Sequence, residues 1–284
     1  MRVGFEILEL ARAAGARKIF VVGIGREVGK TTVLRAVYAA AHATGVRTAL
    51  ASMNPKHRLW LRPQTLFVTA RGLLPRSPAA QIVKLSPLQS PTGALLYARS
   101  ISSGSYELAG APAASGVREV VTTLAGFSEI VIVDGAVDRV AALAGSDGAI
   151  VVACGAGGAG TMQEAVDDAA ALVARLRVPQ VDPTAPAIDV TGALTAAHAA
   201  TFLAARETRQ IVVRDPTQIA LSGRGGTRSL SQLRIRCRRP LRVIAATVAS
   251  IGTERSFEPG PFLTAVAEAT GLPTFDVYAG VRAA

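Results

Sequence analysis

A glycine-rich segment near the start of the chain constrains its fold more than any other feature. Residues 17–22 are mostly apolar and β-branched, and an alanine-rich segment with a helical pattern runs from Lys30 to about Thr44. Between them lies the sequence Gly23-Ile24-Gly25-Arg26-Glu27-Val28-Gly29-Lys30-Thr31-Thr32. A second apolar segment, 47–53, follows the helical one. This strand–helix–strand order predicts a parallel sheet, with the glycine-rich loop at the carboxyl end of a buried strand.

The loop predicts a phosphate-binding site. Backbone N–H groups of such a loop, and of the helix N-terminus behind it, point at phosphate oxygens. Lys30 would reach the β and γ phosphates as a catalytic residue, and the hydroxyl of Thr31 would bind Mg²⁺. We therefore expect an α/β P-loop nucleotide-binding fold, in which the nucleotide contacts Gly25, Arg26, Glu27, Val28, Gly29, Lys30, Thr31 and Thr32.

The spacing of the glycines is longer than in the common phosphate loop. The usual pattern would place a glycine at position 24, where this chain has Ile24. The interval from Gly23 to Gly29 resembles the loop of dethiobiotin synthetase and its relatives, and Val28-Gly29-Lys30-Thr31 matches that form directly. The sequence has no guanine-specific Asn/Thr-Lys-x-Asp motif, so we expect ATP rather than GTP.

A carboxylate follows another buried strand. Val131, Ile132 and Val133 are apolar and lead directly into Asp134 and a glycine. A carboxylate at such a strand end can hold Mg²⁺, directly or through water. We predict Asp134 to be a metal ligand and a catalytic residue, with an ordinary strand-ending Asp-Gly turn as the alternative.

Three further polar residues are candidates by position. Lys56 follows the strand after the phosphate-loop helix, where strand ends face the ligand crevice of α/β sheets. It is a possible contact for substrate or phosphate. Asp138 and Arg139 come shortly after Asp134 and could sense the γ-phosphate, although a local surface ion pair explains them equally well.

Composition excludes several classes of protein. No apolar run reaches the roughly 20 residues that span a bilayer, and the first residues do not resemble a secretory signal. The cysteines, Cys154 and Cys237, lie far apart and in no metal-binding pattern. We expect a cytoplasmic protein without a disulfide framework, a zinc site or a membrane association.

The chain is strongly basic, with a formal net charge of +11 that comes mostly from arginine. Much of this charge is consistent with scattered solvated side chains. Residues 224–242 are the exception, since seven arginines fall within this stretch. On a strand, Arg234, Arg236 and Arg238 would share one face, which is a plausible docking surface. No nucleic-acid-binding motif accompanies it, so nucleic acid is not the expected partner.

The chain divides most naturally at its proline-rich stretch 179–187. We expect a nucleotide-binding domain over 1–180 and a C-terminal α/β unit over 186–284 that could extend the first sheet or stand apart. Residues 54–115 contain many Pro, Ser and Gly and short β-like pieces at 66–70, 81–85, 94–100 and 106–110. We interpret them as an insertion or lid over the nucleotide face.

Taken together, the motifs resemble one family over nearly the full length. This is the P-loop reactivase subunit associated with adenosylcobalamin-dependent lysine 5,6-aminomutase. Besides the loop, the residues that carry the resemblance lie at 67–74, 92–93, 107–110, 133–136 with Arg139, 191–195, 215–217 and 274–277. The resemblance implies ATP-dependent exchange of damaged cobalamin from the mutase, usually with a partner protein or second subunit. The chain departs from the pattern at Gln218-Ile219-Ala220, which lacks the expected lysine and aromatic residue.

Two other functions remain open from the residues. The first is a small-molecule ligase of the dethiobiotin synthetase type, in which a lysine such as Lys56 would hold the carboxylate that ATP activates. The second is a basic binding module for nucleic acid or an acidic protein, using the arginines of 224–242. The sequence leaves the oligomeric state undecided, and a homodimer is one possibility.

Overall fold

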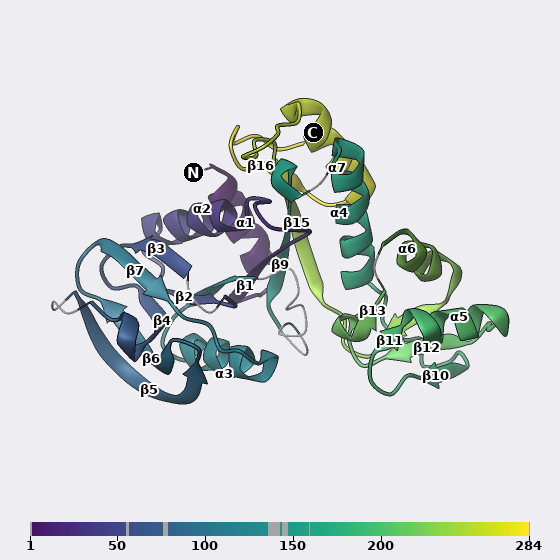
Figure 1. Ribbon diagram of the computed structural model, residues 1–284, viewed down its shortest axis with the longest axis horizontal. Coiled ribbons are helices and arrows are strands. Elements are labelled where there is room, and N and C mark those ends of the chain that lie inside the picture. The colour runs from purple at the N-terminus through teal and green to yellow at the C-terminus, as the bar shows by residue number, and fades with distance from the viewer. Residues whose placement is uncertain are drawn as a thin grey trace.

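A computed structural model gives the fold of the chain (Figure 1). The structure describes residues 2–54, 57–75, 79–135, 143, 147–158, 160–221 and 223–283. These residues form an α/β protein with a large, mostly parallel central sheet and seven α-helices. The helices are α1 (Arg2–Ala13), α2 (Lys30–Ala43), α3 (Ala114–Ala125), α4 (Met162–Leu176), α5 (Ala196–Ala204), α6 (Gly223–Gln232) and α7 (Pro259–Thr270).

The central sheet has nine strands. In spatial order they are β16 (Thr274–Asp276), β15 (Arg242–Ala249), β9 (Ala149–Gly155), β1 (Lys18–Gly23), β8 (Ile130–Asp134), β2 (Thr48–Ser52), β4 (Leu66–Ala70), β6 (Gly93–Ser100) and β5 (Ala80–Ser90). The pairs from β16 to β4 are parallel, and only β6 and β5 run antiparallel to their neighbours. β1 therefore lies inside the sheet, between β9 and β8.

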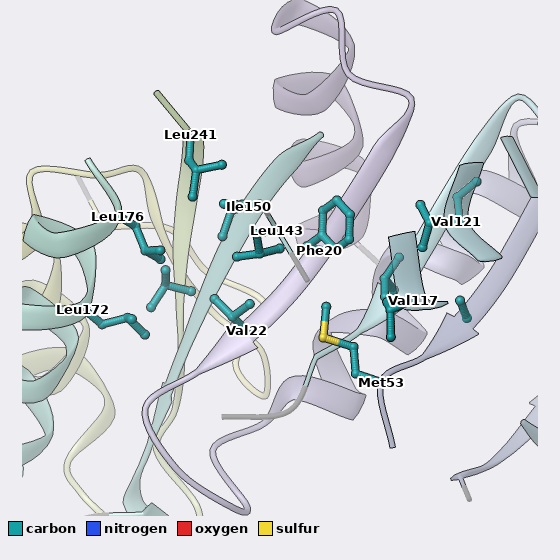
Figure 2. Close-up of a cluster of buried hydrophobic side chains, with 14 of the residues drawn as sticks. Phe20, Val22, Met53, Val117, Val121, Leu143, Ile150, Leu172, Leu176 and Leu241 are labelled. Carbon is teal, nitrogen blue, oxygen red and sulfur yellow. The ribbon is translucent and has the colours of Figure 1, made fainter. Parts of the chain in front are cut away.

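Both faces of the sheet are covered, because its strands alternate between two apolar clusters. Phe20 and Val22 of β1 belong to the cluster that also holds residues of α3, α4 and α7 (Figure 2). Ile19 and Val21 of the same strand belong to the opposite cluster, with residues of α1 and α2. A strand buried on both faces is expected to be apolar throughout, as the segment 17–22 indicated.

The predicted insertion, 54–115, mostly enlarges the sheet. β4, β6 and β5 form one edge of it, and β4 has the predicted bounds, Leu66–Ala70. β3 (His57–Leu61) and β7 (Gly104–Leu108) form a separate antiparallel pair, whose Leu59, Leu61 and Leu108 contribute to the apolar cluster under α2. The reason is physical: the short β-like pieces bury apolar residues by pairing with the sheet and packing on it.

The C-terminal stretch, 186–284, is divided between two sheets. β10 (Ala187–Asp189), β12 (Gln210–Val213) and β14 (Ile235–Cys237) form a small parallel sheet, next to the short pair β11 (Leu194–Thr195) and β13 (Ile219–Ala220). These strands share a separate apolar core with α5 and α6. In Figure 1 the strands and the two helices lie together beyond α4. β15, α7 and β16 then return to the central sheet. One part of the stretch therefore forms a separate unit, and the other part extends the first sheet.

Among the described residues, none of the helices is long and apolar enough to cross a membrane.

Candidate functional site

The glycine-rich loop lies where the sequence predicts, between β1 and α2. Gly29 precedes the first residue of α2 and has φ 88°, in the left-handed region that favours glycine. Gly29 makes no side-chain hydrogen bond that caps α2, and an N-terminus of this kind is suited to an anion. The positive end of the helix dipole adds to this preference.

The loop is held by the ends of the neighbouring strands. Val28 is buried, and a Cβ at Gly155 would lie 2.8 Å from its Cα atom. A Cβ at Gly157 would lie 2.7 Å from the carbonyl oxygen of Glu27, and one at Gly29 would lie 2.8 Å from Cβ of Ala249. Gly155 at the end of β9 and Gly157 after it therefore let a second loop pack against the glycine-rich loop, and neither residue lines the cavity in front of it.

Two charged side chains of the loop have partners within the protein. Nζ of Lys30 donates a hydrogen bond to the carbonyl oxygen of Gly25 at 2.5 Å, so the ammonium group folds back over the loop. Glu27 has φ 54° and accepts a hydrogen bond from the hydroxyl of Thr253 at 3.1 Å. The loop is thus fastened both to itself and to the segment after β15.

A cavity of about 440 Å³ opens in front of the loop. One wall consists of the predicted residues Glu27, Val28, Gly29, Lys30, Thr31 and Thr32. The other wall, which the sequence analysis missed, consists of Ile251, Gly252, Thr253 and Tyr278. A usable signal was present: these residues follow the carboxyl ends of β15 and β16, and ligands of parallel sheets bind at that edge. Among the described residues, the segment 54–115 contributes nothing to this lining.

Asp276, at the end of β16, fixes this second wall. Its side chain is fully buried. Oδ1 accepts hydrogen bonds from the N–H groups of Tyr278 at 2.7 Å and Ala279 at 2.8 Å. Oδ2 accepts one from the hydroxyl of Ser250 at 3.2 Å. One carboxylate therefore joins the two segments that face the loop.

Asp134 is the last residue of β8 and is aligned with Val21 of β1. It is 2% exposed. Nδ1 of His57 lies 2.7 Å from its Oδ2, and Nδ2 of Asn54 donates a hydrogen bond to the same oxygen at 3.2 Å. Oδ1 is buried and has no hydrogen-bond partner. An orphaned carboxylate oxygen of this kind fits a cation ligand.

Other predicted site residues cannot be placed in this way. Lys56, Asp138 and Arg139 lie outside the described residues. No sequence pattern indicated a role for His57, which the structure brings to Asp134.

A larger cavity, of about 850 Å³, lies between α4 and α6. Its walls carry Glu164, Asp167 and Asp168, opposite Arg228. Burial, together with the charges of Asp167 and Glu164, raises the pKa of Asp168 above its usual value. Such a concentration of negative charge disfavours a triphosphate.

Several arginines of the basic stretch are engaged within the chain. Arg238 forms an ion pair with Asp189 at 2.6 Å, and Arg242 donates to the carbonyl oxygen of Ala14 at 2.7 Å. Arg234 donates to the carbonyl oxygen of Thr208 at 3.4 Å. These contacts give three of the arginines a role in joining the protein's own elements.

The chain was matched to no known protein in three comparisons. No protein-family model, curated protein or solved structure matches the chain.

Proposed function

We propose that this chain is a P-loop nucleoside triphosphatase that binds ATP with Mg²⁺ in the cavity at the glycine-rich loop. One observation carries the proposal. The loop joins an interior strand to the N-terminus of α2, faces a cavity, and has Asp134 at the end of the adjacent strand. Phosphate, helix dipole and metal ligand would then meet at one edge of the sheet.

Each residue of the site has a separate task in this proposal. The backbone N–H groups of 25–32 bind the phosphates, and Lys30 exchanges its contact with Gly25 for the β and γ phosphate oxygens. Thr31 and Asp134 would hold Mg²⁺, which the orphaned Oδ1 of Asp134 fits. When bound, the ion would supply positive charge that offsets the charge of the phosphates. Lys30 and Asp134 are thus the residues on which turnover depends.

The second wall of the cavity suits a nucleobase. Ile251 is 57% exposed and Tyr278 is 49% exposed, although both are large apolar side chains. Both line the cavity of the phosphate loop. Apolar and aromatic surfaces of this kind bind the flat faces of bases. We therefore assign the phosphates to the loop and the base to the wall formed by Ile251 and Tyr278.

The cellular role that we propose is reactivation of a cytoplasmic cobalamin-dependent aminomutase, together with that enzyme or a second reactivase subunit. The likeness of the motifs supports it, as do two free thiols that are both buried, which fit a reducing compartment. Trp60 on β3 and Leu85 on β5 are 65% and 69% exposed and lie away from the nucleotide cavity. Exposed apolar side chains of this size favour a protein partner, with a homodimer as a further possibility.

The test is the rate of ATP hydrolysis with and without the purified aminomutase. We expect slow intrinsic turnover and faster turnover with the partner, because phosphoryl-transfer sites are often completed by added groups. Lys30→Ala should abolish both rates while the protein stays folded. If the mutase neither binds nor changes the rate, the reactivase role is wrong, and product formation from small carboxylates alone would favour the ligase.

A further inference from the structure

His57 lies at this site, but it belongs neither to the phosphate loop nor to the proposed metal ligands. It is the first residue of β3, and its side chain is 14% exposed. β3 pairs with β7, and His57 is aligned there with Leu108. The imidazole nevertheless reaches Asp134, with 2.7 Å between Nδ1 and Oδ2. A buried imidazole next to a strand-end carboxylate indicates that His57 has a role at this site.

The two oxygens of Asp134 have different surroundings. Asn54 donates a hydrogen bond to Oδ2 and Nδ1 of His57 approaches it within ion-pair distance without the geometry of a hydrogen bond, whereas Oδ1 is buried without a hydrogen-bond partner. Rotating the carboxylate would break both contacts at once. The two neighbours therefore select one orientation, in which Oδ1 remains available.

The neighbours are themselves held in place. The carbonyl oxygen of Asn54 accepts a hydrogen bond from the N–H of Gly110 at 2.8 Å. A Cβ at Gly110 would lie 2.7 Å from that oxygen, so only glycine allows the segment after β7 to approach so closely. The N–H of Met53 donates to the carbonyl oxygen of Asp134 at 2.8 Å. The β3–β7 pair and the end of β2 thus form a rigid support for one carboxylate.

We propose that His57 is a positioning residue, which holds Oδ2 of Asp134 so that Oδ1 is presented to Mg²⁺ in the nucleotide site. This inference rests on the proposed function. Residues that orient a metal ligand commonly change metal affinity by about 10- to 100-fold when they are replaced. A purely structural role would instead change stability and leave the metal requirement unaltered.

Three variants separate these roles. His57→Leu keeps an apolar side chain of similar size but removes the contact to Oδ2. His57→Asn places an amide group near the position of Nδ1 and retains a polar contact to Oδ2. His42→Leu is the matched control, because His42 contacts Arg62 on the surface and not Asp134. The readout is the Mg²⁺ concentration for half-maximal binding of a non-hydrolysable ATP analogue, next to binding in EDTA.

We expect His57→Leu to raise the Mg²⁺ requirement by about 10-fold or more. His57→Asn and His42→Leu should stay near the wild type, and binding in EDTA should be the same in all proteins. If His57→Leu does not fold, Asn54→Ala serves instead. It removes the other contact to Oδ2 and should raise the requirement in the same direction.

Two results would overturn the inference. One is an unchanged Mg²⁺ requirement in folded His57→Leu or in Asn54→Ala. The other is an equal loss in His57→Asn and His57→Leu, since the retained polar contact would then be irrelevant. A wild-type protein that binds no nucleotide at any Mg²⁺ concentration would contradict the proposed function itself, which is a distinguishable failure.

Discussion

Gly29 shows how much of the site depends on one residue. Its φ of 88° is unfavourable for any residue with a Cβ, and an added Cβ would also lie 2.8 Å from Cβ of Ala249. The conformation alone costs roughly 1–2 kcal/mol in a residue other than glycine. The contact with Ala249 would, in addition, push the loop away from the end of β15. A loop that moves here loses the alignment of its N–H groups.

Gly29→Ala is therefore expected to lose nucleotide affinity as well as stability. Gly45→Ala is the matched control, because Gly45 has φ 71° and no atom within 4 Å of an added Cβ. Both variants should lose at least about 1 kcal/mol in urea unfolding, and Gly29→Ala should lose more because of its contact with Ala249, but only Gly29→Ala should lose ATP binding in calorimetry. Equal ATP affinity in the two variants would argue against the loop as the phosphate site.

The two thiols make a second prediction at the scale of single residues. Burial raises the pKa of Cys154 to about 12 and that of Cys237 to about 11. At pH 8 both thiols are therefore protonated, and both are buried. A reagent that reacts with thiolates should label neither of them in the native protein. Both should react at once in denaturant. Fast labelling of one thiol under native conditions would show that its core opens readily.

At the scale of elements, sequence patterns predicted most of the central sheet. The segments expected at 17–22, 47–53 and 66–70 are β1, β2 and β4 within one or two residues. Such strands were predictable because they are buried on both faces and therefore mostly apolar. α6 was not predicted, since its sequence Gly-Arg-Gly-Gly-Thr-Arg-Ser-Leu-Ser-Gln has little helix propensity and packing determines it.

The residues of the site, like the elements, were only partly predictable from the sequence. Residues 25–32 and Asp134 could be proposed because they stand next to recognisable strands. His57 could not, since its role depends on which strands become neighbours. Ile251 and Tyr278 follow strand ends, but only the strand order shows that these ends lie beside the loop. The contact of His57 with Asp134 requires β2 to lie beside β8, an order that no local pattern specifies. Strand order was thus the missing information.

The crossing of α1 and α2 provides a test at the scale of elements. A Cβ at Gly4 would overlap the carbonyl oxygen of Ala36, so the two helices can touch only through a glycine. Gly4→Ala should destabilise the protein by about 1–3 kcal/mol, the usual cost of overpacking. Gly260, near the start of α7, has nothing within 4 Å of an added Cβ.

The control variant Gly260→Ala should therefore be neutral or stabilise the protein by roughly 0.5 kcal/mol, because alanine is the better helix former. Urea unfolding at neutral pH measures both variants. A Gly4→Ala protein as stable as the wild type would mean that the helices cross elsewhere or pack loosely.

For the whole molecule, the buried thiols link folding to alkaline pH. The folded pKa of Cys154, about 12, lies above the unfolded value of 9.0. Below pH 9 both states keep the proton, so this group leaves the free energy of unfolding unchanged. As the pH rises from 9 toward 12, only the unfolded state ionises, and stability falls by about 1.4 kcal/mol per pH unit.

Cys154→Ala should therefore show a shallower decline than the wild type when urea unfolding is compared between pH 8 and pH 11. The comparison cancels the titration of tyrosine and lysine, which both proteins share. At pH 8 the variant should be the less stable one, because a smaller side chain packs the core less well. Curves that stay parallel up to pH 11 would mean that the thiol ionises in the folded state.

The most direct test of the central claim is calorimetric titration with ATP, with and without Mg²⁺, of the wild type and of Lys30→Ala. The account predicts that the wild type binds ATP in a Mg²⁺-dependent manner and prefers it to GTP. Folded Lys30→Ala should bind at least about 10-fold more weakly, because a charge-assisted contact worth about 1.5–3 kcal/mol is removed. Unchanged MgATP affinity in that variant, or no binding by the wild type, would contradict the account.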